Sequence, residues 1–376
     1  MKQYLELLSD VYHRGIAHSD RTGVGRHSVF SAEKRFSLKE GFPLVTTRKM
    51  YPDTMITETV WFASGSIDVK DLLTSLSVLR GKEVNKTIWD QWLVSPDSID
   101  IFIKKHQSAF TEFVESDNLE SILTHVKTFL SLRFNQTIGP LYGAAWRNAP
   151  KEENNPLSPL TAFEDLPSDK VARWSKDYET SAKTIEQTLE QYCVNRYAET
   201  YDQLNEVLIN LKKRPYSSRH VVSAWIPQWL PFEELTPQEN ILLGKGALAP
   251  CHAMFQFFVS PPKEEGGKKQ LSLKLTIRSA DTPVGTPYNI AQYSLLLAMV
   301  AHTTDMEANE FIFSPGDYHC YTDQKDLIPV QLAREPMTLP TLWLNPEVTD
   351  FFKFTPADIR IENYVSHPAI IYPVAT

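Results

Sequence analysis

Apolar residues recur along the chain with two periods, one typical of helices and one typical of strands. Helical spacing predicts helices over residues 1–15, 54–64 and 67–80, and an apolar block predicts another over 290–303. Strand-like alternation, broken by a Gly-Phe-Pro turn, covers residues 26–48. From residue 219 onward, β-branched and aromatic runs predict further strands at 220–225, 254–260, 271–277, 310–313 and 341–344. The pattern therefore predicts an α+β fold whose sheet comes mainly from the second half of the chain.

Two long stretches interrupt this pattern. Residues 98–132 carry spaced apolar side chains that predict two amphipathic helices. Residues 148–168 are rich in Pro, Asn, Glu and Asp, which indicates a surface loop, and residues 170–213 are polar and helix-prone. No linker divides the chain, so we expect a single domain over residues 1–376.

The composition is that of a folded globular protein, with 42% hydrophobic and 22% charged residues. Lys and Arg total 38 against 46 Asp and Glu, and the resulting net charge of −8 argues against broad wrapping of nucleic acid. Three cysteines without a CxxC pair argue against a disulfide scaffold and a metal site. No apolar run approaches the ~20 residues that span a bilayer, and the first residues lack the features of a signal peptide. We therefore expect a cytoplasmic protein that needs neither nucleic acid nor a membrane.

Cys251 is the first candidate for chemistry. It is either a small buried hydrophobic residue or a nucleophile, and a nucleophilic thiolate needs nearby positive charge. Arg278 is a candidate for that cation, with a plain surface arginine as the alternative. A thiol hydrolase that uses His252 as its base lacks a separate orienting group in a recognisable order.

Two further arginines lie in settings that suit an anion. Arg21 stands among small residues, and Arg219 follows two serines. The planar guanidinium fork matches phosphate geometry. With Arg278 they would form a phosphate clamp, although each pattern alone is weak.

Glu58 is a polar residue within an apolar helix. It either faces solvent or is buried, and a buried carboxylate favours a proton-handling role. Trp89 and Trp92 are either core aromatics or a wall for a flat ring.

Three more side chains fit a nucleotide. The amide of Asn289 offers one donor and one acceptor, which match O4 and N3–H of uracil, whereas a carboxylate would suit cytosine. His319 and Tyr321 alternate on one strand face, where they would hold a sugar hydroxyl.

Eleven motifs containing these residues follow one another in a specific order. They are Asp20–Gly25, Gly41–Thr47, Glu58 with Trp61 and Phe62, Thr87–Trp92, Leu141–Arg147, Ser217–His220 with Ala224 and Trp225, Ala249–His252, Arg278–Asp281, Gly285–Asn289, Gly316–Tyr321 and Pro373–Thr376. In this order they resemble the thymidylate synthase family. The resemblance covers about 1–92, 138–148 and 200–376, while about 93–137 and 151–199 look like helical insertions.

The resemblance implies a mixed sheet packed with helices and a sheet-mediated homodimer with two shared sites. It implies dUMP as substrate and 5,10-methylenetetrahydrofolate as cofactor. Carried over by position, Cys251 adds to C6 of uracil, Glu58 organises water and proton transfers, and Tyr142 assists removal of the C5 proton. The catalytic set that it implies is Cys251, Glu58, Tyr142, Arg278 and Asp281.

The resemblance also implies two binding sets. Arg21 and Arg278, with Arg219 of the partner subunit, hold the phosphate. The remaining nucleotide contacts are Ser279, Ala280, Asn289, His319 and Tyr321. The folate contacts are Arg48, Tyr51, Ile88, Trp89, Asp281, Val284, Gly285, Tyr288 and Ala375, the last in a tail that closes over the site.

Departures from the family pattern bear on the product. Ser218 replaces a phosphate-binding arginine, for which Arg214 or Arg26 are candidate substitutes. Tyr51 stands where a histidine is usual, and Thr282–Tyr288 is smaller and more polar than the usual apolar wall. Hydroxyl groups of Thr282, Thr286 and Tyr51 suit an ordered water that would quench the reaction intermediate, and Thr376 ends the tail where a hydrophobic residue is usual.

Water at that step gives a hydroxymethyl group, whereas hydride from the folate gives a methyl group. The sequence therefore favours a deoxyuridylate hydroxymethylase, such as bacteriophages use to modify their DNA, with thymidylate synthase as the alternative. A silent nucleotide- or RNA-binding relative is a third reading, and the presence of Cys251, Arg278 and Asn289 argues against it.

Overall fold

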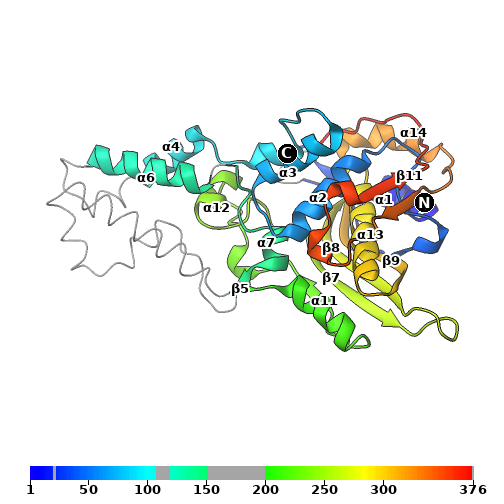
Figure 1. The fold of residues 1–376 in the computed structure, drawn as a ribbon. Helices are drawn as coiled ribbons and strands as arrows, with labels where there is room; N and C mark the ends of the chain where they lie inside the picture. The colour runs from blue at the N-terminus through cyan, green and yellow to red at the C-terminus, as the bar shows by residue number, and fades with distance from the viewer. Residues whose placement is uncertain (20–22, 107–118, 135, 151–199, 375–376) are drawn as a thin grey trace.

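The computed structural model describes residues 1–19, 23–106, 119–134, 136–150 and 200–374 (Figure 1). Its centre is a sheet with the strand order β1-β2-β9-β8-β7-β6, in which β3 also pairs with β9. β8 and β9 run parallel and the other neighbours antiparallel, so the sheet is mixed, as the family resemblance implies. The strands are β1 (Ile16–His18), β2 (Arg26–Phe30), β3 (Lys34–Ser37), β6 (Val221–Ser223), β7 (His252–Ser260), β8 (Gln270–Asp281) and β9 (Glu307–Tyr321).

Helix α13 (Gly285–Thr303) connects the two parallel strands and packs on both of them. It is apolar nearly all round, and most of its side chains are buried, as expected for a helix covered on every side. Helix α2 (Pro52–Ser64) packs on α13 (Figure 1), and α1 (Lys2–Arg14) packs on β2. These helices and one face of the sheet enclose the main core.

Smaller elements surround this core. The helices are α3 (Val69–Arg80), α7 (Tyr142–Arg147), α11 (Gln203–Lys213) and α14 (Ile328–Leu332). The 3-10 helices are η1 (Leu38–Glu40), η2 (Ile88–Trp92), η5 (Pro227–Trp229), η6 (Thr322–Leu327), η7 (Phe351–Lys353) and η8 (Pro356–Asp358). Two short ladders pair β4 (Ala149–Pro150) with β5 (Thr200–Tyr201) and β10 (Thr341–Leu344) with β11 (Ile359–Glu362).

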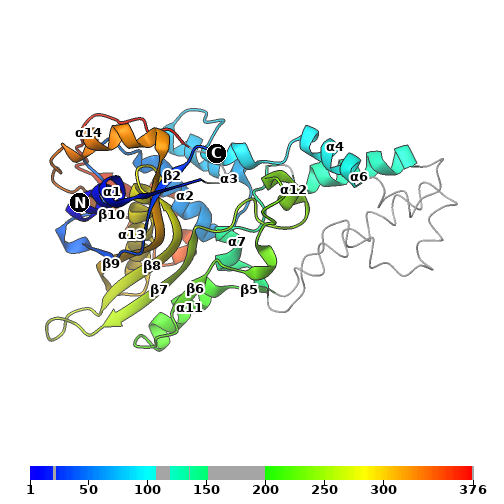
Figure 2. The same cartoon turned by 180° about the vertical axis from the view of Figure 1, so that it is seen from behind.

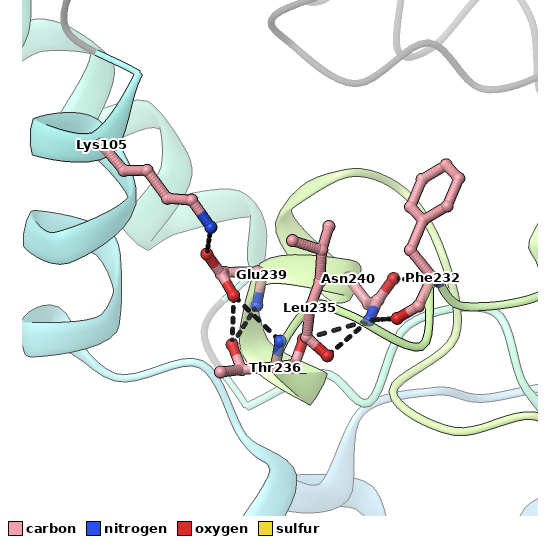
Figure 3. Close-up of polar contacts among 6 residues, drawn as sticks. All are labelled: Lys105, Phe232, Leu235, Thr236, Glu239 and Asn240. Atoms are coloured by element: carbon pink, nitrogen blue, oxygen red, sulfur yellow. Dashed lines mark hydrogen bonds and ion pairs between the residues drawn. The ribbon is translucent and has the colours of Figure 1, made fainter.

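A second, smaller core lies away from the sheet, where α4 (Pro96–Lys105) and α6 (Leu119–Phe134) pack on α12 (Pro237–Leu242) (Figure 2). Phe102 is fully buried in it. At its edge, Lys105 reaches across from α4 to Glu239 on α12, with Nζ and Oε1 2.5 Å apart (Figure 3). The buried amide of Asn240 closes the preceding loop by bonding to the backbone of Phe232.

Within the described ranges the predicted helices are present, including the two amphipathic helices in 98–132. The strand prediction over 26–48 is wrong beyond residue 37. Residues 44–47 are fully or almost fully buried but belong to no strand, because they pass through the core as an irregular segment. The three central strands are longer than their apolar runs, since backbone pairing continues into the polar residues at their ends. Predictions for 151–199 lie outside the described residues.

Among the residues that the structure describes, no helix combines the length and the apolar character needed to cross a bilayer.

Candidate active site

Cys251 stands on the turn that leads into β7, and its side chain is half-buried. Its backbone N–H donates to the Tyr142 hydroxyl at 3.0 Å, and its carbonyl accepts from the Arg278 backbone N–H at 2.8 Å. Burial raises the pKa of the Cys251 thiol, and the nearby Arg278 charge opposes that rise. The surroundings are therefore those of a thiol whose ionisation depends on positive charge beside it.

Arg278 is bound to the same turn. Its Nε donates to the Pro250 carbonyl at 3.1 Å and its Nη2 to the Ala249 carbonyl at 2.8 Å. The guanidinium remains exposed, 5.7 Å from the ring centroid of Trp225. It is therefore fixed beside Cys251 with a face free to meet an anion, which the reading as a plain surface arginine does not explain.

Glu58 projects from α2 and accepts a hydrogen bond on each carboxylate oxygen. Trp89 Nε1 donates to Oε1 at 2.6 Å, and Gln292 Nε2 donates to Oε2. Burial nevertheless raises the pKa of Glu58. The structure thus favours the enclosed, proton-handling interpretation over the solvated one.

Sequence reasoning missed Gln292. The sequence does carry a signal, because Gln292 is a large polar residue within the mainly apolar stretch 290–301.

Asp281 ends β8 and lies opposite His319 in the parallel ladder with β9. Its Oδ1 accepts from the Val284 backbone N–H at 3.1 Å and its Oδ2 from Gln324 Nε2 at 3.2 Å. Burial raises the pKa of Asp281 to about 6, although both hydrogen bonds favour the ionised form. Such a carboxyl group changes its charge near neutral pH.

Asn289 projects from the first turns of α13 toward His252, with Nδ2 and Nε2 2.8 Å apart. Burial lowers the pKa of His252 to about 3, so the imidazole is neutral and its Nε2 accepts from the amide. The ring also stacks on Tyr142 at 4.6 Å between centroids. His252 therefore orients an amide, and the contacts found for it do not support the thiol hydrolase interpretation.

His319 and Tyr321 stand two residues apart on β9, and their rings meet edge to face at 5.3 Å. His319 Nδ1 also contacts Asp317 Oδ1 at 3.2 Å. Ser279 and Ala280 lie on the neighbouring strand, where Ala280 is buried. The ends of β8 and β9 thus carry the predicted nucleotide contacts of this region side by side.

Arg48 is buried, and its Nη2 donates to the Pro283 carbonyl at 2.8 Å. Its guanidinium also faces the ring of Tyr372 in the tail, at 5.7 Å from the centroid. Arg48 therefore ties the segment after β8 to the tail.

Of the other predicted folate contacts, Tyr51 and Ile88 are exposed to solvent, whereas Trp89 is buried. Tyr51 is 46% exposed and Ile88 49% exposed, so both offer apolar surface to a ligand. Trp89 is buried among aromatic rings, where it packs against Trp61 and Trp92. Its contacts favour a core aromatic that bonds to Glu58 over a wall for a flat ring.

Val284, Gly285 and Tyr288 surround the start of α13. The Val284 N–H bonds to Asp281, as described above, and Gly285 is the first residue of the helix. Burial raises the pKa of Tyr288, whose hydroxyl lies by the Tyr51 backbone. These residues connect Asp281 with the Tyr51 segment.

The predicted phosphate contacts that the structure describes are Arg278, at the Cys251 turn, and Arg219, at the edge of the sheet. Arg219 is exposed just before the edge strand β6, and Arg214 is exposed at the end of α11. Arg26 is paired with Asp317, with Nη2 and Oδ2 2.9 Å apart, so its charge is already engaged within the chain. Arg26 is therefore the weaker substitute for the arginine missing at Ser218. Arg21, Cys193 and Ala375 lie outside the described residues.

Within the described ranges, no group of three or more His, Cys, Asp or Glu side chains is arranged to hold a metal ion.

A cysteine fixed beside an exposed arginine, with an enclosed glutamate and a paired amide, is an arrangement suited to nucleophilic catalysis on an anionic substrate. The family model for thymidylate synthase matches residues 2–376, and the chain belongs to the thymidylate synthase family. It is 33% identical over 370 residues to a protein named thymidylate synthase from Francisella philomiragia subsp. philomiragia, covering 98% of each chain.

The protein is accordingly a one-carbon transferase that acts on dUMP with methylenetetrahydrofolate. The residues present fit a folate. Asp281 offers a carboxylate to the N–H groups of a pterin edge, and Tyr51 and Ile88 offer exposed apolar surface to its rings. The fold prediction and the predicted cofactor are confirmed.

Proposed function

We propose that this protein is a thymidylate synthase, which converts dUMP to dTMP with the folate as both carbon and hydride donor. The observation that carries the proposal is the docked tail. Tyr372 is buried, and the Pro373 carbonyl accepts from Gln324 beside Asp281. A tail held over the site excludes water, and a dry site favours hydride transfer over quenching by water.

The roles of the side chains follow from their contacts. Arg278 stabilises the Cys251 thiolate, which adds to C6 of the uracil ring. Asn289, oriented by His252, presents its carbonyl oxygen to N3–H and its second amide hydrogen to O4. The folate supplies the one-carbon unit and the hydride.

Proton transfers fall to two enclosed groups. Glu58, held by Trp89 and Gln292, is the carboxyl group whose raised pKa suits exchange of protons with the ring. Tyr142, bonded to the backbone of Cys251, lies beside the nucleophile and serves removal of the C5 proton.

The hydroxymethylase remains the second candidate, because the hydroxyls of Thr282 and Thr286 are buried and have no hydrogen-bond partner among the described residues. A bound water would satisfy them. The insertions no longer favour this candidate. A protein named thymidylate synthase matches 98% of this chain along 98% of its own length, so a chain of this length is not peculiar to a hydroxymethylase. Tyr51 is exposed, whereas the two threonines are enclosed.

We further propose a homodimer formed through the open face of the sheet. Along β7, Phe255, Phe257 and Val259 face the core, while Phe258 is 66% exposed and Met254 is also exposed on the opposite face. Exposed apolar side chains on one sheet face are typical of an interface. Arg219 precedes β6, which pairs with β7, so it is suited to reach the phosphate site of the partner subunit.

The test is to incubate the protein with dUMP and methylenetetrahydrofolate. The absorbance of dihydrofolate is followed while the nucleotide is identified by mass. We expect dTMP and dihydrofolate in equal amounts. Hydroxymethyl-dUMP without dihydrofolate would overturn the proposal in favour of the second candidate.

A further inference from the structure

A fully buried glutamine, Gln324, joins three parts of the site that are far apart in sequence. It lies in η6, just after β9, and none of its surface is exposed. Its Nε2 donates to Asp281 Oδ2 at 3.2 Å and to the Pro373 carbonyl in the tail at 2.9 Å. Its Oε1 accepts from the Tyr321 backbone N–H at 2.9 Å.

These contacts fix the orientation of the amide. Rotating it by half a turn would aim Oε1 at two acceptors, the carboxylate of Asp281 and the carbonyl of Pro373, and would aim Nε2 at a donor. Both amide hydrogens are used, one on the catalytic carboxylate and one on the tail. The tail and the carboxylate therefore depend on one rigid group.

We propose that Gln324 is a positioning residue that couples docking of the tail to the orientation and charge of Asp281. The inference rests on the proposed function, because Asp281 has a part in turnover only there. With the tail docked, the amide is held with one N–H on Asp281, which stabilises the carboxylate. Without that N–H, the carboxylate loses a donor in a buried place and takes up a proton more readily.

Other groups act on the same carboxylate. The titratable and charged side chains that face Asp281 from the surrounding elements are Arg48, His319, Cys251, Tyr4, Tyr372 and Cys320. In the part of the chain that the structure describes, none of these side chains hydrogen-bonds to both Asp281 and the tail as Gln324 does, although Arg48 also faces Tyr372. Gln324 is therefore the side chain that links the carboxylate and the tail by hydrogen bonds.

The experiment compares Gln324→Glu with Gln331→Glu in the full chain. Gln324→Glu keeps the acceptor for Tyr321 and so keeps the helix cap, but it replaces both donors with a carboxyl group. Gln331 is also fully buried and also touches the tail, since its Oε1 accepts from the Tyr372 hydroxyl at 2.9 Å. In Gln331→Glu that acceptor survives, and Asp281 is not touched.

Two measurements follow. In Gln324→Glu, we expect the acid limb of kcat against pH to move up by about one pH unit, because a lost donor and an added carboxyl group both raise the pKa of Asp281. We also expect carboxypeptidase to release the C-terminal residues several-fold faster. In Gln331→Glu, neither the pH limb nor the release rate should change. If Gln324→Glu changes neither the acid limb of kcat nor the rate at which carboxypeptidase releases the C-terminal residues, Gln324 serves only to cap the helix, and the proposal is overturned.

A third variant guards against misfolding. Gln324→Met removes the hydrogen bonds without adding charge, and the same direction of both changes is expected, with a smaller pH shift. Tail release is measured without turnover, so it still tests the coupling if the wild-type protein makes hydroxymethyl-dUMP. Release as slow as in the wild type, in a Gln324→Met protein that melts as the wild type does, would refute the coupling.

Discussion

The indole nitrogen of Trp89 lies 2.6 Å from Oε1 of Glu58 and donates a hydrogen bond to it. The two residues come from different elements, η2 and α2, and the indole ring is buried among aromatic neighbours. Because the ring cannot move without disturbing that packing, the carboxylate is held in place by the core. An aromatic cluster thus determines where a proton-handling group stands.

Trp89→Phe tests this relationship. The ring packing is largely kept, but the donor is lost, so the pKa of Glu58 rises further above its usual range. We expect kcat to fall roughly 10- to 100-fold, as for loss of a hydrogen bond to a charged group, and the pH profile to move upward. Trp92→Phe is the matched control, since Trp92 packs against Trp89 and no hydrogen bond joins it to Glu58. An unshifted profile in Trp89→Phe would show that the indole only fills space.

The sequence predicts the local elements well because their apolar periods are regular. The helices at α1, α2, α3 and α13 and the central strands all begin within a few residues of their predicted positions. The segment 41–48 is the exception. It is as apolar as a strand, but its backbone partners are irregular, for instance the Thr46 carbonyl with the His367 N–H. Burial alone does not tell a strand from a buried loop.

The order of the motifs was enough to predict the family and to name candidate site residues, but the contacts that support those residues could not be predicted. Cys251, Arg278 and Glu58 stand in motifs whose order identifies the family. Gln292 and Gln324 support the carboxylates from positions 234 and 43 residues away. Such pairings depend on how α13 and η6 pack, which the local period does not encode.

Cys251→Ala should abolish the covalent complex with dUMP, because no other thiol lies on the site turn. Cys320→Ala is the comparison. Cys320 is fully buried on β9, and burial raises the pKa of its thiol to about 11, so it is inert. We expect the adduct to survive in Cys320→Ala at a cost of about 1 kcal/mol in stability. Mass spectrometry of the intact protein, incubated with dUMP and folate, detects the adduct. An adduct on the Cys251→Ala chain would show that Cys251 is not the nucleophile.

Asn289→Asp should exchange the preferred pyrimidine. A carboxylate cannot donate to O4 of uracil, but it accepts from the amino group of cytosine. It also meets the acceptor nitrogen of His252, so the ring must change tautomer, and we expect kcat/KM for dUMP to fall at least roughly 100-fold. Binding of dCMP should improve over the wild type in a titration. Asn309→Asp, on β9 and bonded to Ser272, is the control and should leave both affinities unchanged.

The pH dependence of stability should carry the signature of Asp281. Its folded pKa of about 6 lies above the unfolded value near 3.9, so its contribution to stability is fully present below pH 4 and is lost as the pH rises through 6. Asp281→Asn does not titrate. The stability of the variant minus that of the wild type should therefore grow by about 2–3 kcal/mol between pH 4 and pH 8, whatever the pH-independent effect of the substitution.

Asp317→Asn gives the opposite sign. Burial acts to raise the pKa of Asp317, but His319 and Arg26 outweigh it and hold that pKa below its usual value. Its contribution is present above the unfolded pKa and is lost as the pH falls, so the difference, variant minus wild type, should shrink as the pH rises from acid toward the unfolded value. Denaturant unfolding at several pH values measures both. If the stability difference from the wild type depends on pH in the same way for Asp281→Asn and Asp317→Asn, the raised pKa assigned to Asp281 is wrong.

The small core of α4, α6 and α12 should melt without the site. Phe102→Ala removes a fully buried ring from it and should cost about 3–5 kcal/mol there, whereas Lys105→Ala breaks a half-exposed ion pair and should cost at most about 1 kcal/mol. Hydrogen exchange should become faster in α4, α6 and α12 of Phe102→Ala but not in β7, β8 or β9, because the ring lies in a separate cluster. The Cys251 adduct with dUMP should still form. If hydrogen exchange in the sheet of Phe102→Ala becomes faster by the same factor, the two cores unfold as one unit.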